Sequence, residues 1–116
     1  MLIEFKVANY RSIREEQTLS FIASNYSDEL PQNLIPLDLP GLKKGTKLVK
    51  AIALYGANAS GKSNIVSALE FFTNFARNSA TTLQHGVSTG TQPFKLATAC
   101  ASEPSRFEVT AVIQGV

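Results

Sequence analysis

The residues best suited to chemistry form a glycine-rich run at positions 56–63. The run reads Gly56, Ala57, Asn58, Ala59, Ser60, Gly61, Lys62 and Ser63, which is glycine, four residues, glycine, lysine and serine. Glycine lets a backbone turn tightly and approach an anion closely. A lysine followed by a hydroxyl suits phosphate groups and Mg²⁺. This run, called the glycine-rich loop below, therefore predicts a site for a nucleoside triphosphate.

Each part of the glycine-rich loop has an expected role. The backbone amides of residues 59–63 should point toward phosphate oxygens, helped by the positive end of a following helix. Lys62 is the expected catalytic side chain because it would reach the β- and γ-phosphates, and the Ser63 hydroxyl would ligate Mg²⁺. Asn64 follows directly and is counted with the nucleotide-binding residues. The loop pattern does not distinguish ATP from GTP.

The elements on either side of the loop support this interpretation. Residues 48–55 are mostly apolar, which is typical of a strand covered on both faces. Beyond the loop, apolar residues recur at three- and four-residue spacing and predict a helix of about five turns that packs on the sheet. They are Ile65, Ala68, Leu69, Phe72, Phe75 and Ala76. In this strand, loop and helix context, an incidental glycine-rich turn is the weaker interpretation.

The remaining elements indicate an α/β fold with a mixed sheet and antiparallel N-terminal strands. Alternation over residues 2–7 and 17–22 predicts two paired strands, and residues 94–96 and 106–113 predict two more. Residues 24–46 contain several prolines and glycines and predict a surface excursion. Residues 78–93 are polar and predict a connection. The 116 residues are long enough for one modest domain but short for the complete core of an enzyme that hydrolyses nucleoside triphosphates.

Other residues whose side chains could take part in catalysis or binding have simpler structural explanations. Arg11 follows the first strand and either lies in a solvated turn or approaches the nucleotide, and the solvated turn is the commoner case. Phe71, Phe72 and Phe75 resemble an aromatic platform, but helical spacing favours core packing. His85 lies in the polar connection and is interpreted as a surface residue. Cys100 has no activating neighbour in the sequence.

Composition narrows the class of protein. The chain has 44% hydrophobic and 17% charged residues, which indicates folded material, and its formal net charge of +2 does not by itself argue for nucleic acid or a membrane. One cysteine favours a reducing compartment. The N-terminus lacks the features of a secretory signal, and no run reaches membrane-spanning length. A cytoplasmic protein with no membrane partner is expected.

Two segments together resemble a known group of enzymes. Residues 3–13, IEFKVANYRSI, and residues 53–65, ALYGANASGKSNI, are similar to the ABC-type ATPases of the RecF, SMC and OLD (overcoming lysogenization defect) group. The similarity is greatest to AAA-like members in abortive-infection and other anti-phage systems. The C-terminal residues 107–116 resemble the first arm of a hairpin in such proteins. The resemblance implies the N-terminal lobe of an ATPase head, with ATP and Mg²⁺ as cofactors.

The resemblance also assigns roles to single residues. Arg11 and Ser12 match a basic loop near the nucleotide, and Asn58 matches an asparagine near the γ-phosphate. Ala59 departs from the glycine found in many members. Gln114 lies on the expected hairpin strand and is not equated with the family's magnesium-sensing glutamine.

Hydrolysis needs further groups, including an aspartate after an apolar strand. The run that ends at Asp38 contains a proline and is a poor candidate. The magnesium aspartate, the signature motif and the catalytic glutamate are therefore expected after residue 116, so that this chain alone should not turn ATP over. The resemblance implies a homodimer of heads, or a higher oligomer, that controls a nuclease or toxin effector. Two alternatives stay open: a RecF-like repair ATPase that binds DNA, and a small regulator that does not hydrolyse nucleotide.

Overall fold

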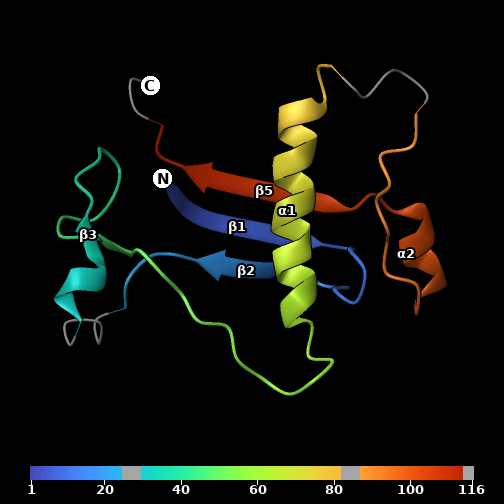
Figure 1. Cartoon of the computed structure of the whole chain (residues 1–116), viewed down its shortest axis with the longest axis horizontal. Helices are drawn as coiled ribbons and strands as arrows, with labels where there is room; N and C mark the ends of the chain where they lie inside the picture. Colours follow the sequence, from blue (N-terminus) through green and yellow to red (C-terminus); the bar gives the residue numbers. More distant parts are fainter. Residues whose placement is uncertain (25–29, 82–86, 114–116) are drawn as a thin grey trace. The chain divides into compact units, whose positions relative to one another are not determined.

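Figure 1 shows a computed structural model of the chain, which describes residues 1–24, 30–81 and 87–113. The strands are β1 (Leu2–Ala8), β2 (Gln17–Ser20), β3 (Leu34–Pro36), β4 (Lys47–Val49) and β5 (Arg106–Ala111). The helices are the 3₁₀ helix η2 (Pro31–Asn33) and the α-helices α1 (Lys62–Asn78) and α2 (Thr98–Ser102). The predicted combination of strands with one long helix is confirmed.

A three-stranded sheet carries the N-terminal strand in its centre. The strand order is β2-β1-β5, and Figure 1 shows both outer strands running opposite to β1. Alternate side chains of β1 are buried, among them Ile3, Phe5 and Val7, as the period of two predicts. The predicted pairing of the first two strands is confirmed, and so is a strand over most of residues 106–113. The predicted mixed sheet is wrong for the described strands, because both outer strands are antiparallel to β1.

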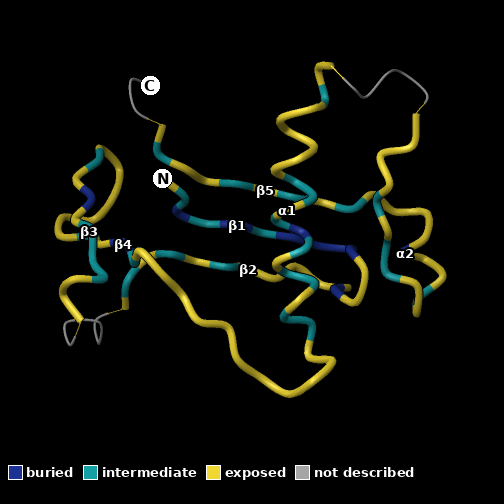
Figure 2. Tube along the Cα trace, viewed as in Figure 1, coloured by how far each residue is buried: buried dark blue, intermediate teal, exposed yellow. Residues whose placement is uncertain are grey.

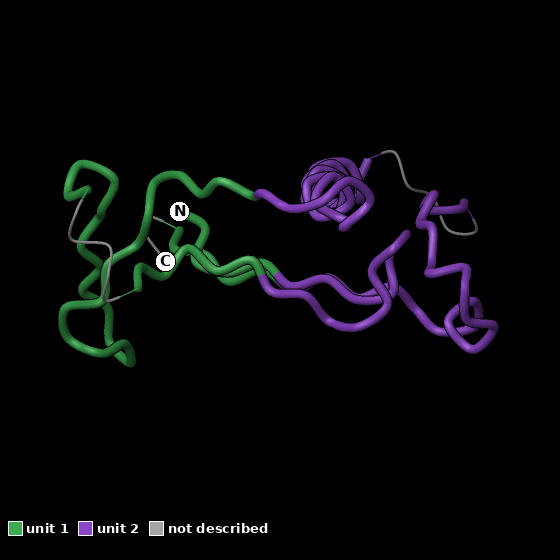
Figure 3. Tube along the Cα trace, turned by 90° about the horizontal axis from the view of Figure 1, so that it is seen from below, with its two compact units in different colours: residues 1–5, 19–54, 109–116 green, residues 6–18, 55–108 purple. Residues whose placement is uncertain are grey.

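The chain divides into two compact units, coloured separately in Figure 3. Unit 1 consists of Met1–Phe5, Leu19–Leu54 and Val109–Val116. Unit 2 consists of Lys6–Thr18 and Tyr55–Glu108, and it therefore contains the whole glycine-rich loop.

Unit 1 is organised around the pair β3 and β4. The two strands are antiparallel, with Ile35 opposite Leu48. Buried Leu37 and Leu48 form a core cluster with Ile3. Part of residues 24–46, predicted to be a surface excursion, is therefore packed structure, because its apolar residues pair with or pack against β4. Pro36 is tolerated in β3 because an edge strand does not need every backbone N–H.

The strand expected over residues 48–55 is wrong for most of its length. Only Lys47–Val49 is a strand, and residues 51–55 are exposed, with Tyr55 93% exposed. The Ala51 N–H is bonded to the side chain of Asn33. Residues 52–55 have no backbone hydrogen-bond partner within the part of the chain that the structure describes. An apolar run forms a strand only where a neighbouring strand pairs with it, so apolar content overpredicted this element.

Unit 2 contains the predicted long helix, α1, which spans 17 residues. Its apolar stripe buries Ala68 and half-buries Phe71, but Val66 is 59% exposed, so the stripe is covered in part. Figure 2 shows that buried residues concentrate along β1 and the turn that follows it, including Tyr10 and Ile13.

The connection between α1 and β5 differs from the prediction. Residues 94–96 form no strand, and the short helix α2 follows them. The Phe94 N–H donates to the Asn9 side chain at 2.9 Å, so a side chain takes the place of a neighbouring strand. Residues 78–81 and 87–93 of the predicted polar connection are irregular apart from the last residue of α1. His85 and Gln114 lie outside the described residues.

Candidate functional site

The glycine-rich loop turns through left-handed backbone conformations into the start of α1. Gly61 has φ +92° and is the N-cap of the helix, and Ala59 has φ +64°. The left-handed region costs a non-glycine residue about 1–2 kcal/mol, so the alanine at position 59 is strained by its backbone rather than by its small side chain. The glycine that many members of the resembling group have at this position therefore has a conformational cause.

The Lys62 side chain folds back over the glycine-rich loop. Its Nζ donates hydrogen bonds to the carbonyl oxygens of Gly56 and Ala57, both at 2.7 Å, and to the Ser60 hydroxyl at 3.3 Å. The side chain is half-buried although the loop around it is exposed. The ammonium group is thus held by the loop itself, at the first residue of α1.

The same region offers unpaired backbone donors. The N–H groups of Asn58, Ala59, Gly61, Lys62 and Ser63 have no acceptor among the residues that the structure describes. The first turn of α1 contains no acidic residue. Helix N-termini leave N–H groups free and carry a partial positive charge, so they attract anions. The loop therefore has the donors and the charge that a phosphate group requires.

A second segment, the turn of residues 9–13, lies against the start of α1. Tyr10 and Ile13 exchange backbone hydrogen bonds at 2.8 and 2.9 Å, which places Arg11 and Ser12 at the tip. The Ser12 hydroxyl accepts a hydrogen bond of 2.5 Å from the Asn64 side-chain amide. It would also lie 3.5 Å from a Cβ atom on Gly61. Ser12 and Asn64 are thus brought together beside the loop.

Arg11 is placed differently from Ser12. Its guanidinium carbon lies 5.3 Å from the centre of the Tyr10 ring, within the range of a cation–π contact. Its backbone N–H donates to the Gln92 carbonyl at 2.7 Å. No hydrogen bond joins the guanidinium to the glycine-rich loop in the described part of the chain. The structure therefore brings Ser12, and not the Arg11 side chain, to the loop.

Asn9, at the base of this turn, is a structural residue that sequence reasoning missed. It is 5% exposed, and its side chain is hydrogen bonded to the Cys100 and Glu103 carbonyls and the Phe94 N–H. The only signal in the sequence is an asparagine at the end of an alternating strand, which ordinarily indicates a turn. Its three partners are more than 80 positions away along the chain, so no local pattern shows them.

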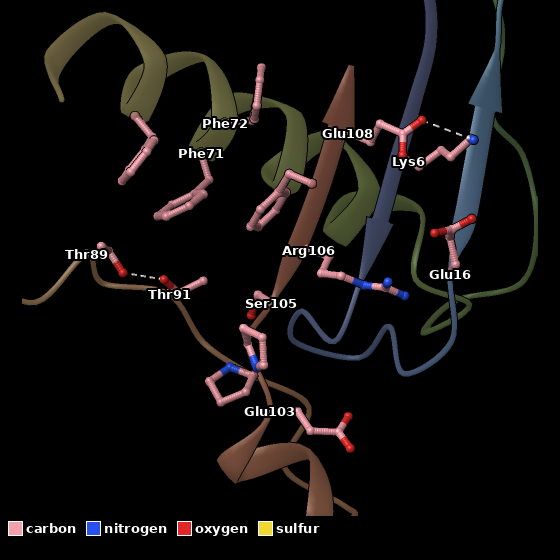
Figure 4. Close-up of a pocket in the computed structure, with 14 residues that line it drawn as sticks. Lys6, Glu16, Phe71, Phe72, Thr89, Thr91, Glu103, Ser105, Arg106 and Glu108 are labelled. Atoms are coloured by element: carbon pink, nitrogen blue, oxygen red, sulfur yellow. Dashed lines mark hydrogen bonds and ion pairs between the residues drawn. The ribbon is translucent and has the colours of Figure 1, made fainter. Parts of the chain in front are cut away.

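A separate cavity of about 690 Å³ lies in unit 2 and is not lined by the glycine-rich loop. Figure 4 shows Phe71 and Phe72 on its α1 side, with Arg106 and the Lys6–Glu108 ion pair on its strand side. The ring centres of Phe71 and Phe107 are 5.3 Å apart. The predicted core role of the helix aromatics is therefore only partly met, since Phe75 is 39% exposed and lines the cavity.

Metal ligands are sparse. No group of three His, Cys, Asp or Glu residues that could hold a metal ion occurs in residues 1–24, 30–81 and 87–113. The exposed Ser63 hydroxyl remains the loop's candidate ligand. Mg²⁺ in proteins commonly keeps several water ligands and shares substrate phosphates, so one hydroxyl fits an ion that arrives with a nucleotide. It does not fit a metal site built by the protein alone.

Sequence comparison places these features in a family. Residues 51–116, more than half of the chain, match the family described as "AAA domain, putative AbiEii toxin, Type IV TA system". The chain belongs to this family. It is thus an AAA-like, ATPase-type nucleotide-binding domain of the toxin–antitoxin and abortive-infection class. The matched region includes the glycine-rich loop, α1, α2 and β5.

Neither a curated protein nor a solved structure matches the chain significantly. The turn of residues 9–13 precedes the region matched by the family. Within the described residues, no helix is both long and apolar enough to span a membrane.

Proposed function

We propose that the glycine-rich loop binds ATP as its magnesium complex. The observation that carries this proposal is the position of Lys62, whose ammonium group is held over the loop at the first residue of α1. A lysine in that position can exchange its contacts with loop carbonyls for contacts with phosphate oxygens. The free N–H groups of the loop supply further donors, and α1 adds its partial positive charge.

The individual roles follow from the chemistry of each residue. The amides of residues 59–63 cradle phosphate oxygens, for which the Ser60 N–H gives up its hydrogen bond to the Ala57 carbonyl, and Lys62 pairs with the β- and γ-phosphates. Ser63 provides the hydroxyl ligand for Mg²⁺, which neutralises phosphate charge when bound. Asn58 lies in the loop at the position that the family resemblance assigns to the γ-phosphate. Ser12 and Asn64 act together, because their side chains are hydrogen bonded.

Arg11 has a weaker claim as a nucleotide ligand. Its guanidinium would have to leave the Tyr10 ring, and an exposed cation–π contact is worth only about 0.5–1 kcal/mol. A negatively charged phosphate can offset that loss. We therefore retain Arg11 as a proposed contact that forms only when the nucleotide is present.

For the whole protein, we propose an ATPase head that dimerises around ATP and controls a nuclease or toxin effector during phage infection. The support is membership of the AAA-domain family together with the resemblance of residues 3–13 and 53–65 to RecF- and SMC-type heads. Hydrolysis belongs to the whole protein, because activation of water requires carboxylates in addition to the loop. The cytoplasm is the compartment in which ATP and these partners meet.

Nucleotide binding can be tested with a fluorescent ATP analogue and the variant Lys62→Ala. Hydrogen bonds to charged groups contribute about 1.5–3 kcal/mol, so the dissociation constant should rise about 10- to 150-fold. Lys95→Ala is a matched control, because Lys95 is an exposed lysine of the same unit that lies outside the loop. Equal affinity of Lys62→Ala and the wild-type protein would contradict the proposed site.

Turnover is tested separately by phosphate release from the whole protein, alone and with DNA. Turnover that Lys62→Ala abolishes would support an ATPase. Binding of ATP without turnover would favour a non-hydrolysing regulator. ATP-dependent DNA binding without an effector would favour a RecF-like repair role.

A further inference from the structure

Asn9 is a buried polar residue whose side chain is hydrogen bonded to three residues of unit 2. Its amide nitrogen donates to the carbonyl oxygens of Cys100, at 2.8 Å, and Glu103, at 2.9 Å. Its amide oxygen accepts the N–H of Phe94 at 2.9 Å. Both amide hydrogens and the amide oxygen are therefore used, which no other side chain except glutamine could reproduce.

The backbone of Asn9 takes part in the same arrangement. Its carbonyl accepts a hydrogen bond from the Ser105 hydroxyl, and its N–H donates to the Arg14 carbonyl at 3.1 Å. Its φ of +51° lies in the left-handed region, which asparagine tolerates better than most residues. Asparagine therefore suits both the hydrogen bonds and the backbone conformation at this position. Glutamine carries the same amide group on a side chain longer by one methylene group, so it would not fit the same short distances to these partners.

The turn anchored by Asn9 ends at the glycine-rich loop. Tyr10 follows Asn9 and is 3% exposed, with ring contacts to Phe71 at 6.0 Å and Phe107 at 5.5 Å. Two residues further on, the Ser12 hydroxyl accepts the hydrogen bond from Asn64. A rigid base therefore holds a short turn whose tip contacts the first turn of α1.

We propose that Asn9 is a positioning residue for the nucleotide site: it fixes the turn of residues 9–13 so that Ser12 holds Asn64 and the start of α1 in place. This inference rests on the proposed function of the glycine-rich loop. Asn9 itself does not touch that loop and acts through Ser12. Through Asn9, the segment of residues 94–105 becomes a support of the nucleotide site.

The test uses three variants of the whole chain: Asn9→Gly, Ser12→Ala and the double variant. Glycine accepts the left-handed φ, so Asn9→Gly removes the amide contacts without adding backbone strain. Ser12→Ala changes only the exposed tip and is expected to preserve folding. Leu37→Ala, in the core of unit 1, is the control for a general loss of stability.

The first measurement is hydrogen exchange of the Asn64 and Ile65 amides without nucleotide. These N–H groups donate to the Gly61 carbonyl at 3.0 and 3.2 Å, so they report directly on the start of α1. Exchange should accelerate in Asn9→Gly and Ser12→Ala but not in Leu37→Ala. Unchanged exchange in Asn9→Gly would overturn the positioning role, whether or not the protein binds ATP.

The second measurement is affinity for a fluorescent ATP analogue. Ser12→Ala should weaken binding about 2- to 10-fold, the effect of losing one neutral hydrogen bond. The affinity of the double variant should equal that of the single variant with the lower affinity, because both changes act through one contact. Independent losses that multiply, or accelerated exchange with unchanged affinity, would overturn the proposal. A wild-type protein that fails to bind ATP would instead contradict the proposed function.

Discussion

Replacing Gly61 with alanine tests whether backbone conformation, rather than the space for a side chain, requires glycine at residue 61 of the proposed nucleotide site. An added Cβ would lie 3.5 Å from the Ser12 hydroxyl, which is ordinary van der Waals contact. The backbone φ of +92°, however, is strained for alanine. The left-handed region costs about 1–2 kcal/mol, so Gly61→Ala should lower the free energy of unfolding by at most that amount.

The same strain should also affect ligand binding. A strained alanine loop can relax in the free protein by leaving the left-handed conformation at residue 61. ATP must then restore that conformation, and the part of the strain that the free protein has relieved, at most about 1–2 kcal/mol, weakens binding by up to about 5- to 30-fold. Gly90→Ala is the matched control, because Gly90 has φ +73°, lies in the same unit and has open space around an added Cβ.

The assay compares both variants by urea denaturation, followed by circular dichroism, and by titration with the fluorescent ATP analogue. Each variant should lose at most about 1–2 kcal/mol of stability, but only Gly61→Ala should bind ATP more weakly. The reasoning is refuted if Gly61→Ala keeps the affinity of the wild-type protein despite its lost stability. It is also refuted if Gly90→Ala weakens binding to the same degree.

Two further predictions concern the sheet side of unit 2. Phe107→Ala removes a half-buried ring that contacts Tyr10 and Phe71, so it should lower the free energy of unfolding by about 2 kcal/mol, below the range for fully buried rings. Phe75→Ala, at a 39% exposed site, should lower it less. Equal losses of stability in thermal denaturation would contradict the packing described. The Lys6–Glu108 pair is 3.2 Å apart with side chains 28% and 63% exposed, so a double-mutant cycle should give a coupling below about 1 kcal/mol that falls in high salt. A larger, salt-insensitive coupling would show that the pair is more buried than the structure indicates.

Local sequence patterns predicted the elements whose buried face is defined by the spacing of their own apolar residues. β1 and α1 were found because alternation and three- to four-residue spacing define one buried face over several turns or residues. The glycine-rich loop was found because phosphate binding needs glycine, lysine and serine at fixed spacing. Residues 48–55 were overpredicted, because apolar content shows that a segment can be covered but not whether a strand lies beside it.

The sequence by itself determined the helix that follows residue 61, and it predicts the phosphate-binding chemistry proposed for residues 56–63. Only the tertiary structure decided which distant residues support that loop: the Ser12 hydroxyl accepts a hydrogen bond from Asn64, and the Asn9 side chain is hydrogen bonded to residues 94, 100 and 103. The physical reason is that hydrogen-bond partners far apart along the chain leave no periodic signal, because they become neighbours only when the chain folds.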